Sequence, residues 1–394
     1  MQRRHLLQGL AGAGLSLGGG QLWATGTGQP CFLLVFLRGG YDAANLLVPV
    51  SSSFYYEARP TIAVARPGTQ EASALELTAD WGLHPALREN LHPLWKQGEL
   101  AFVPFAGSRD TSRSHFETQD GIELGQPLEG TRNYRSGFMN RLAATLKGVE
   151  AMAFTERLPL AFQGEVQVSN TVLRALSRPA VDARQSQIIS AMYQGTALAG
   201  AVNQGFAARD EVMREMAAEM DAASRNAISA RGFELEARRI ARLMKGRHRL
   251  GFVDVGGWDT HVGQGGATGP LASRLEELGR GLAAYAQEMG NRWRDTTVVV
   301  VSEFGRTFRQ NGNNGTDHGH GSVYWVLGGS VRGRQVVGEQ VAVTPSNLFQ
   351  NRDYPVLNEV RSVLGGLLQR QFGLSAAQMA AVFPQAETRD LGLV

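Results

Sequence analysis

Five short runs of almost unbroken apolar residues are spread along the chain and end in glycines or polar residues. Unbroken apolar runs, rather than alternating ones, are typical of strands that are covered on both faces. The pattern therefore predicts strands of a central sheet. They lie at the start of residues 31–50 and within residues 100–107, 249–261, 296–305 and 322–331.

Apolar residues at helical spacing lie between these runs. They predict helices in residues 84–99, 108–123, 271–293 and 356–374, the second of them after a short loop. Residues 184–247 are alanine-rich, charged and poor in helix breakers. This segment predicts helices that either leave the sheet as a bundle-like excursion or cover it. Alternating strands and helices favour an α/β three-layer sandwich, with a mostly parallel sheet between two helical layers.

The first residues differ in character from the rest of the chain. Arg3 and Arg4 precede a weakly apolar, glycine-rich run, and Ala24 offers a small residue for cleavage. This pattern is typical of a twin-arginine export signal in residues 1–24, carried by the twin-arginine translocase, and predicts a periplasmic or secreted protein. Residues 25–394 are then expected to form a single α/β domain.

Composition excludes some classes of function. Removal of the two leader arginines lowers the formal net charge from +3 to +1, so the basic character of the chain says little about its partners. No Lys/Arg stripe or nucleic-acid motif is present, and no nucleic-acid partner is expected. Cys31 is the only cysteine, which excludes an intrachain disulfide. No stretch after the leader is long and apolar enough to span a bilayer.

Acidic and imidazole side chains follow the predicted strands. In mostly parallel sheets, ligands bind beyond the carboxyl ends of the strands. Carboxylate together with imidazole suits zinc and similar divalent ions, and glycines let short side chains converge. The sequence therefore predicts a divalent-metal site, with zinc as a candidate. The candidate ligands are Asp42, Asp259, His261, Glu303, Asp317, His318 and His320. Asp259 and His261 are two residues apart, as are His318 and His320, so in an extended segment each pair is expected to point the same way.

Two of these candidates have structural alternatives. Asp42 follows Gly39 and Gly40 and could cap a turn. Glu303 could form an ion pair with Arg306. Neither alternative is excluded by the sequence.

A second group of candidates lies in "TSRSHF", where a helix is expected to begin. Backbone N–H groups there attract anions, and a serine activated by a metal is a nucleophile. Ser112, Ser114 and His115 are the candidate catalytic residues; alternatively, one serine is simply the N-cap. Arg306 or Arg113 is expected to hold the oxygens of an anionic substrate through its planar guanidinium.

Four motifs, "FLRGGYDAANLLVP", "SRSHFETQD", "GGWDTH" and "SEFGRT…DHGHG", resemble the domain-of-unknown-function 1501 family of exported bacterial proteins. That family is similar in fold to the alkaline phosphatase and sulfatase superfamily. The resemblance implies an alkaline-phosphatase-like fold with a metal-supported nucleophile at a helix start. Ser114 or Ser112 matches this nucleophile.

The resemblance also implies metal ligands. Asp42 matches an aspartate that binds metal after the first strand. Asp259 and His261 resemble a later pair that binds a second metal, at a tighter spacing than usual. His318 or His320 matches the final histidine of the superfamily.

One position departs from the superfamily. An Asp-His pair is expected directly after a strand, whereas this chain has Glu303 and Phe304 there. Because Phe304 cannot bind a metal, one ligand is missing unless His115 or the second of His318 and His320 replaces it. A centre with one metal is therefore an open alternative to a centre with two.

Three functional interpretations follow. The first is an exported metal-dependent hydrolase of phosphate or sulfate esters, with an anionic small molecule or polymer as substrate. The second is a non-catalytic exported protein that keeps the fold and binds a polysaccharide or an envelope partner. The third treats the loop cluster as structural ion pairs without a metal.

Overall fold

The computed structural model describes residues 29–173, 183–207 and 232–394. The predicted leader lies outside these residues, as do parts of the predicted helical segment 184–247. Among the described residues, no helix has the length and the apolar character needed to cross a membrane. The export route and the extent of the domain stay predictions.

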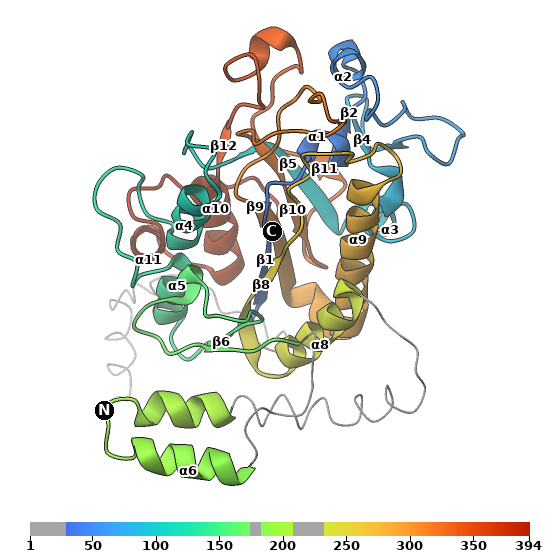
Figure 1. Ribbon diagram of the computed structural model, residues 1–394. Helices are drawn as coiled ribbons and strands as arrows, with labels where there is room; N and C mark the ends of the chain where they lie inside the picture. Colours follow the sequence, from blue (N-terminus) through green and yellow to red (C-terminus); the bar gives the residue numbers. More distant parts are fainter. Residues whose placement is uncertain (1–28, 174–182, 208–231) are drawn as a thin grey trace, which may run out of the picture.

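Nine strands from the described part of the chain form one central sheet (Figure 1). Its order is β11-β5-β10-β9-β1-β8-β6-β7, with β12 also paired to β5. Strand β10 runs antiparallel to both of its neighbours, whereas the other pairs are parallel. The strands are β1 (Cys31–Leu37), β5 (Leu100–Gly107), β6 (Glu150–Ala153), β7 (Ser169–Asn170), β8 (His248–Val255), β9 (Thr296–Ser302), β10 (Ser322–Leu327), β11 (Gln335–Val336) and β12 (Asn358–Glu359).

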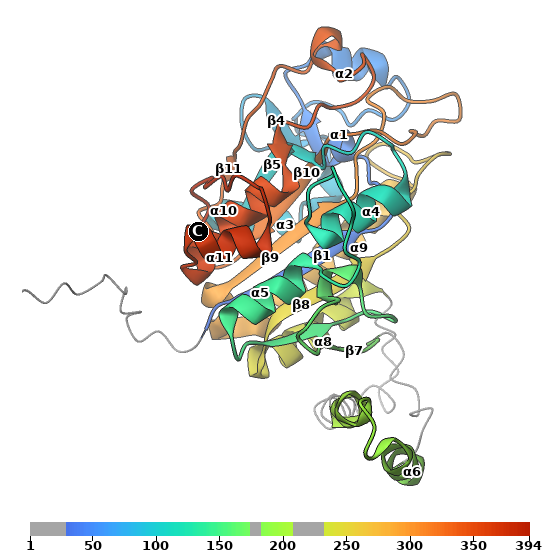
Figure 2. The same cartoon turned by 90° about the vertical axis from the view of Figure 1, so that its left-hand side faces the viewer.

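Successive residues of a strand point to opposite faces, so an unbroken apolar strand supplies two cores. In β1, Cys31 and Leu33 belong to one buried cluster, and Phe32 and Leu34 belong to the other. Helices α3, α8 and α9 cover the first face of the sheet, and α4, α5, α10 and α11 cover the second (Figures 1 and 2). This confirms the predicted α/β class with helical layers on both faces of a mostly parallel sheet. These helices are α3 (Leu91–Gln97), α4 (His115–Leu124), α5 (Phe138–Leu146), α8 (Phe233–Gly246), α9 (Pro270–Met289), α10 (Val360–Phe372) and α11 (Ala376–Val382).

Smaller elements surround this sandwich. A second, antiparallel sheet has the order β2-β4-β3. The segment expected to be one helix over 84–99 forms a 3-10 turn and then α3, because Asn90 interrupts it and caps α3 with its side chain. In the predicted helical region, α6 (Ala183–Tyr193) lies apart from the sandwich, whereas α8 packs against α9 on the sheet. The small elements are α1 (Ala43–Leu46), β2 (Leu47–Pro49), α2 (Ser53–Ala58), β3 (Leu75–Glu76), β4 (Trp81–Leu83) and 3-10 turns at Pro85–Leu87, Leu160–Phe162, Gly290–Asp295 and Pro345–Asn347.

The topology brings four loops to one edge of the sheet. Strands β1, β5, β8 and β9 are mutually parallel, so their carboxyl ends meet at the upper edge in Figure 1. Because β10 runs the other way, its first residue lies at the same edge. The connection between β9 and β10, residues 303–321, therefore begins and ends at this edge.

Candidate metal centre

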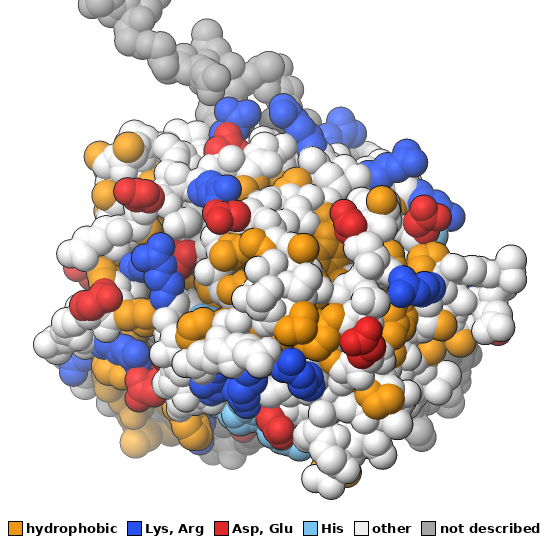
Figure 3. Space-filling model, turned by 90° about the horizontal axis from the view of Figure 1, so that it is seen from above, with side chains coloured by type: hydrophobic (Ala, Val, Ile, Leu, Met, Phe, Trp, Pro, Cys, Tyr) orange, Lys and Arg blue, Asp and Glu red, His pale blue; other side chains and the backbone are white. Residues whose placement is uncertain are grey.

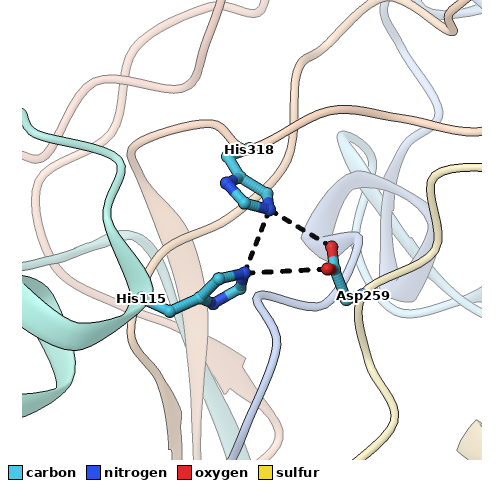
Figure 4. Close-up of side chains that lie close together, drawn as sticks. All are labelled: His115, Asp259 and His318. Carbon is cyan, nitrogen blue, oxygen red and sulfur yellow. Dashed lines mark hydrogen bonds and ion pairs between the residues drawn. The ribbon is translucent and has the colours of Figure 1, made fainter.

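Side chains from three separate segments converge at this edge (Figure 4). His115 is the first residue of α4, Asp259 follows β8, and His318 precedes β10. Their ligating atoms lie within 4.8 Å of one another. His115 Nε2 is 3.0 Å from His318 Nε2, and the Asp259 carboxylate is 3.3 Å from His318 Nε2 and 3.7 Å from His115 Nε2. His261 places its Nε2 3.2 Å from His318 Nε2 and 2.9 Å from Asp259 Oδ1.

The other ring nitrogen of each histidine faces an acceptor. His115 Nδ1 lies 2.8 Å from Glu303 Oε1, and His261 Nδ1 lies 3.1 Å from Asp317 Oδ1. His318 Nδ1 lies 3.2 Å from a backbone carbonyl, that of residue 113. A carboxylate or a carbonyl accepts but does not donate, so each Nδ1 carries the hydrogen. In their neutral forms, His115 and His261 therefore each bring an unprotonated Nε2 to within 3.2 Å of His318 Nε2.

This arrangement fits a zinc-type ion. Metal-ligating histidines almost always donate their second ring N–H to a carboxylate or a carbonyl. Tetrahedral zinc, with bonds of about 2.0–2.1 Å to imidazole nitrogen, spaces its ligand atoms about 3.3–3.4 Å apart. The Nε2 separations of 3.0 and 3.2 Å are close to that spacing. The His115–Asp259–His318 group, with His261 against two of its members, is a candidate divalent-metal centre.

Charges around the centre also fit a divalent cation. Three carboxylates, those of Asp259, Glu303 and Asp317, lie on or directly behind the histidines. Burial opposes the ionisation of Glu303, but hydrogen bonds from His115 and other donors outweigh it and lower the pKa of this carboxyl. Arg306 donates from Nη2 to Asp259 Oδ1 at 2.6 Å. With neutral imidazoles, these groups sum to two negative charges, which one divalent ion would balance.

Phe304 forms the apolar floor of the centre. Its ring centroid lies 4.9 Å from that of His115 and 5.0 Å from that of His318. Gly40 makes room for this ring, because a Cβ at Gly40 would lie 2.5 Å from Phe304 Cε2. The residue that cannot bind a metal thus packs beneath two that can.

Gly39 holds the loop after β1 against the centre. Its N–H donates to Glu303 Oε1 at 2.7 Å, and a Cβ at this position would lie 2.7 Å from the backbone nitrogen of Asp259. Its φ of +122° is in a region that favours glycine. The Gly39-Gly40 pair is therefore required by close packing around the site.

The structure corrects the expectation for Asp42. This carboxylate is buried and lies 2.5 Å and 3.0 Å from the two terminal nitrogens of Arg59. Gln264 Nε2 donates to the same carboxylate at 2.5 Å. Both oxygens are occupied by these donors, so Asp42 belongs to a structural ion pair and lies outside the histidine cluster.

The structure also corrects the expectation for His320. Spacing suggested that His318 and His320 point the same way. Instead, the His320 ring packs against the ring of Phe349 at an angle of 39°, with centroids 4.8 Å apart. Burial lowers the pKa of His320 to about 4. His115 takes the place in the cluster that His320 was expected to fill.

The remaining candidates lie beside the centre. Ser114 caps α4 by accepting from the N–H of residue 117 at 3.5 Å, and the exposed Ser112 accepts from Ser114 N at 3.2 Å. Arg113 donates from Nε and Nη2 to Asp353 Oδ2 at 2.9 and 2.7 Å. These contacts match the structural alternative for the serines and hold the Arg113 guanidinium on a protein carboxylate.

Part of the centre is accessible to solvent. Figure 3, a view onto this edge, shows histidine side chains at the surface beside Lys or Arg side chains. The side chains of His115, Asp259 and His318 are 26%, 41% and 27% exposed. A ligand outside the protein can therefore reach the cluster.

Comparison with known proteins places the chain in a family. The family model described as "Protein of unknown function (DUF1501)" matches residues 31–383. The chain belongs to this family. The match confirms the family that the four sequence motifs indicate. No curated protein matches the chain.

Solved structures show only remote likeness. The C-terminal periplasmic domain of EcEptC from Escherichia coli, in complex with Zn, is 10% identical with a TM-score of 0.41, covering 92% of this chain and 88% of that chain. A protein in the alkaline phosphatase superfamily from Vibrio parahaemolyticus is 12% identical with a TM-score of 0.38, covering 86% and 71%. Ps i-CgsB in complex with k-i-k-neocarrahexaose is 10% identical with a TM-score of 0.37, covering 89% and 74%. At these scores, the likeness carries no argument about activity or ligands.

Proposed function

We propose that this protein binds a divalent metal, zinc by preference, and uses it to hydrolyse phosphate or sulfate esters outside the cytoplasm. One observation carries the proposal: His115, His261 and His318 each give their Nδ1 hydrogen to an acceptor, and their Nε2 atoms gather beside Asp259. Such an arrangement is typical of metal-binding histidines.

His115, Asp259 and His318 would hold the ion, and His261 is the candidate for a fourth ligand. A bound zinc ion supplies Lewis acidity to an ester oxygen and a nucleophilic water at neutral pH. Structural zinc sites are closed, whereas catalytic ones keep a position open to substrate. The partial exposure of all three side chains therefore favours a catalytic centre.

Two features favour an anionic substrate. Helix α4 begins at His115, so its N-terminal N–H groups and its dipole lie beside the centre. Arg306 is buried and donates to Asp259 through Nη2 only, while Nε and Nη1 have no hydrogen-bond partner among the described residues. Its positive charge lies next to the centre and stabilises negative charge that develops there.

The contacts of Ser114 favour water over serine as the nucleophile. The serine oxygen accepts a helix N–H, and it is the residue after it, His115, that reaches the cluster. We therefore expect Ser114→Ala to keep most of the activity. His318→Ala should abolish it.

The test has two stages. Metal content is measured on protein purified without chelator, and hydrolysis is screened on aryl phosphates, phosphodiesters and aryl sulfates. His115→Ala and His318→Ala should lose both metal and activity, whereas His92→Ala, which changes a histidine outside the cluster, should lose neither. Wild-type protein that retains no zinc, manganese or cobalt would refute the metal centre. Metal-loaded protein that hydrolyses none of the esters would refute the enzyme.

The alternative, a metal-holding binding protein, is favoured by a different observation. Phe116 and Val262 directly follow His115 and His261, and their residues are 81% and 70% exposed. Large exposed apolar side chains beside a site suit contact with a polysaccharide or an envelope partner. Bound metal without turnover, together with a loss of partner binding in Phe116→Ser, would support this function.

A further inference from the structure

A buried polar network lies directly behind the candidate metal centre. Its hub is the Gln264 side chain, which is fully buried. Gln264 Oε1 accepts from Thr260 Oγ1 at 3.1 Å and from Thr316 Oγ1 at 2.8 Å, while Nε2 donates to Asp42 Oδ2 at 2.5 Å. A carboxylate accepts hydrogen bonds and does not donate them. The Gln264 NH2 group therefore faces Asp42, and its amide oxygen faces the two threonines.

Both threonines are next to residues of the centre. Thr260 lies between Asp259 and His261, and Thr316 directly precedes Asp317, whose carboxylate holds His261 Nδ1. Thr316 N also donates to Thr260 O at 3.1 Å. The hub therefore fixes the loop after β8 and the β9–β10 connection relative to each other at the point where each supplies a ligand or its support.

The other end of the network includes Arg59, which lies in a third loop, directly after α2. Arg59 pairs with Asp42 and donates from Nε to Phe308 O at 2.7 Å and from Nη2 to Thr307 O at 3.1 Å. Thr307 in turn accepts from Asp317 N at 3.0 Å. The segments that these contacts join are mostly irregular. Besides this network, backbone hydrogen bonds from Gly263 N to Asn313 O and from Gln264 N to Asn314 O, both at 2.9 Å, also join the loop after β8 to the β9–β10 connection.

We infer that Gln264, with Thr260 and Thr316, is a positioning element that sets the spacing of the metal ligands, and that Asp42 serves the site through it. This inference rests on the metal centre proposed above. None of these side chains contacts the ion; each acts on the loops that carry Asp259, His261 and Asp317. Removal of one hydroxyl should allow the two loops to shift relative to each other. The spacing between the ligand atoms that they carry would then change.

The experiment compares matched substitutions at each threonine. Thr316→Val keeps the shape and removes the hydroxyl, whereas Thr316→Ser keeps the hydroxyl and removes a methyl group. The readouts are zinc affinity, by competition with a chromophoric chelator, and the melting temperature of the metal-free protein. Loss of support behind ligands typically weakens metal binding by about 10–100-fold. We expect Thr316→Val and Thr260→Val to weaken zinc binding by about 10-fold, and the serine variants to stay within about 3-fold of wild type.

The pattern separates positioning from stability. A serine variant loses buried methyl contacts and should melt at a lower temperature with its zinc affinity intact. A valine variant loses a buried hydrogen bond, so it should also melt at a lower temperature, but its zinc affinity should fall as well. Equal zinc affinity in wild type and in both valine variants would overturn the positioning role while leaving the metal centre standing. Wild-type protein without measurable zinc affinity would overturn both.

Discussion

Glu303→Gln tests whether the carboxylate behind His115 belongs to a metal centre. The side chain is 1% exposed, and Oε1 accepts from His115 Nδ1 at 2.8 Å. Glutamine has nearly the same shape, and its amide oxygen can accept the three hydrogen bonds that Oε1 accepts, while its NH2 group can donate to Ser302 Oγ, which also donates to Leu37 O. The substitution therefore removes one negative charge and little else. The other donors to this carboxylate are Gly39 N, Gln119 Nε2 and Ser302 Oγ, at 2.7, 2.8 and 2.8 Å.

The expected effect depends on pH in a defined way. Loss of a carboxylate partner behind a metal-ligating histidine costs about 10–100-fold in affinity, or about 1.4–2.7 kcal/mol. The hydrogen bond to Glu303 also raises the pKa of His115 above its ordinary value, so in wild type a proton competes with the metal. Near pH 8 the full loss should appear. Near pH 6 the loss should shrink, because Glu303→Gln also weakens the competing proton.

The assay is zinc affinity by chelator competition at about pH 8 and about pH 6, with the melting temperature of the metal-free protein as a check on folding. Glu359→Gln is the matched control, because Glu359 is a mostly buried carboxylate that caps α10 away from the centre. A Glu303→Gln protein that binds zinc as tightly as wild type at the higher pH would refute the assignment of this carboxylate.

Two further outcomes are expected from the packing. Gly40→Ala should lower the free energy of unfolding by at least about 1–3 kcal/mol, which is the cost of a left-handed backbone at φ +67° alone. It should also weaken zinc binding, because the new Cβ displaces Phe304. A urea titration that finds the variant as stable as wild type would contradict the packing. Burial lowers the pKa of His84 from 6.5 to about 4, so this neutral histidine stabilises the fold above about pH 6.5, and that contribution is lost as the pH falls toward 4. Between about pH 7.5 and pH 5, wild type should therefore lose about 2 kcal/mol more stability than His84→Gln, and parallel pH profiles of the two proteins would contradict this.

Much of the architecture follows from the apolar runs alone. β1, β5, β8, β9 and β10 fall within the predicted segments because each is buried on both faces, and unbroken apolar sequence has few other uses at that length. The parallel order then requires that loops after these strands meet at one edge. For this reason the sequence brings Asp259, His261, Glu303, Asp317 and His318 to one place.

The sequence does not reveal which acids are already paired. Asp42 occupies the same kind of position as Glu303, one loop after a buried strand. Its partner Arg59 lies in a stretch without a periodic signal, and only the folded chain shows the two side chains facing each other. For His115 the sequence leaves the role open, since a residue after an N-cap serine is usually just the first residue of a helix. The direction of the His115 side chain depends on where α4 begins after β5 at the edge of the sheet.

The prediction that side chains two residues apart point the same way is correct in the loop after β8 and wrong in the β9–β10 connection. Asp259 and His261 do point the same way, with 2.9 Å between Oδ1 and Nε2. His318 and His320 do not, because the His320 ring packs against Phe349, from a loop some thirty residues later in the chain. A rule about extended chains holds only where no distant residue competes for the side chain.

The remaining alternative, an ion-pair cluster without a metal, makes the opposite prediction about pH. His115, held by Glu303, has a raised pKa, whereas burial and the charge of His115 lower the pKa of His318. Without a metal, the His115 proton is what bridges the two Nε2 atoms.

A group whose pKa is raised on folding stabilises the fold fully below its unfolded pKa and ceases to do so as the pH rises through its folded pKa. An ion-pair cluster should therefore weaken as the pH rises through the raised pKa of His115. A zinc centre needs that proton to leave, so zinc should stabilise the protein increasingly over the same range. Melting temperatures with and without zinc, measured from about pH 6 to about pH 8.5, should diverge as the pH rises. Two curves that fall together would leave the ion pairs as the better account of the cluster.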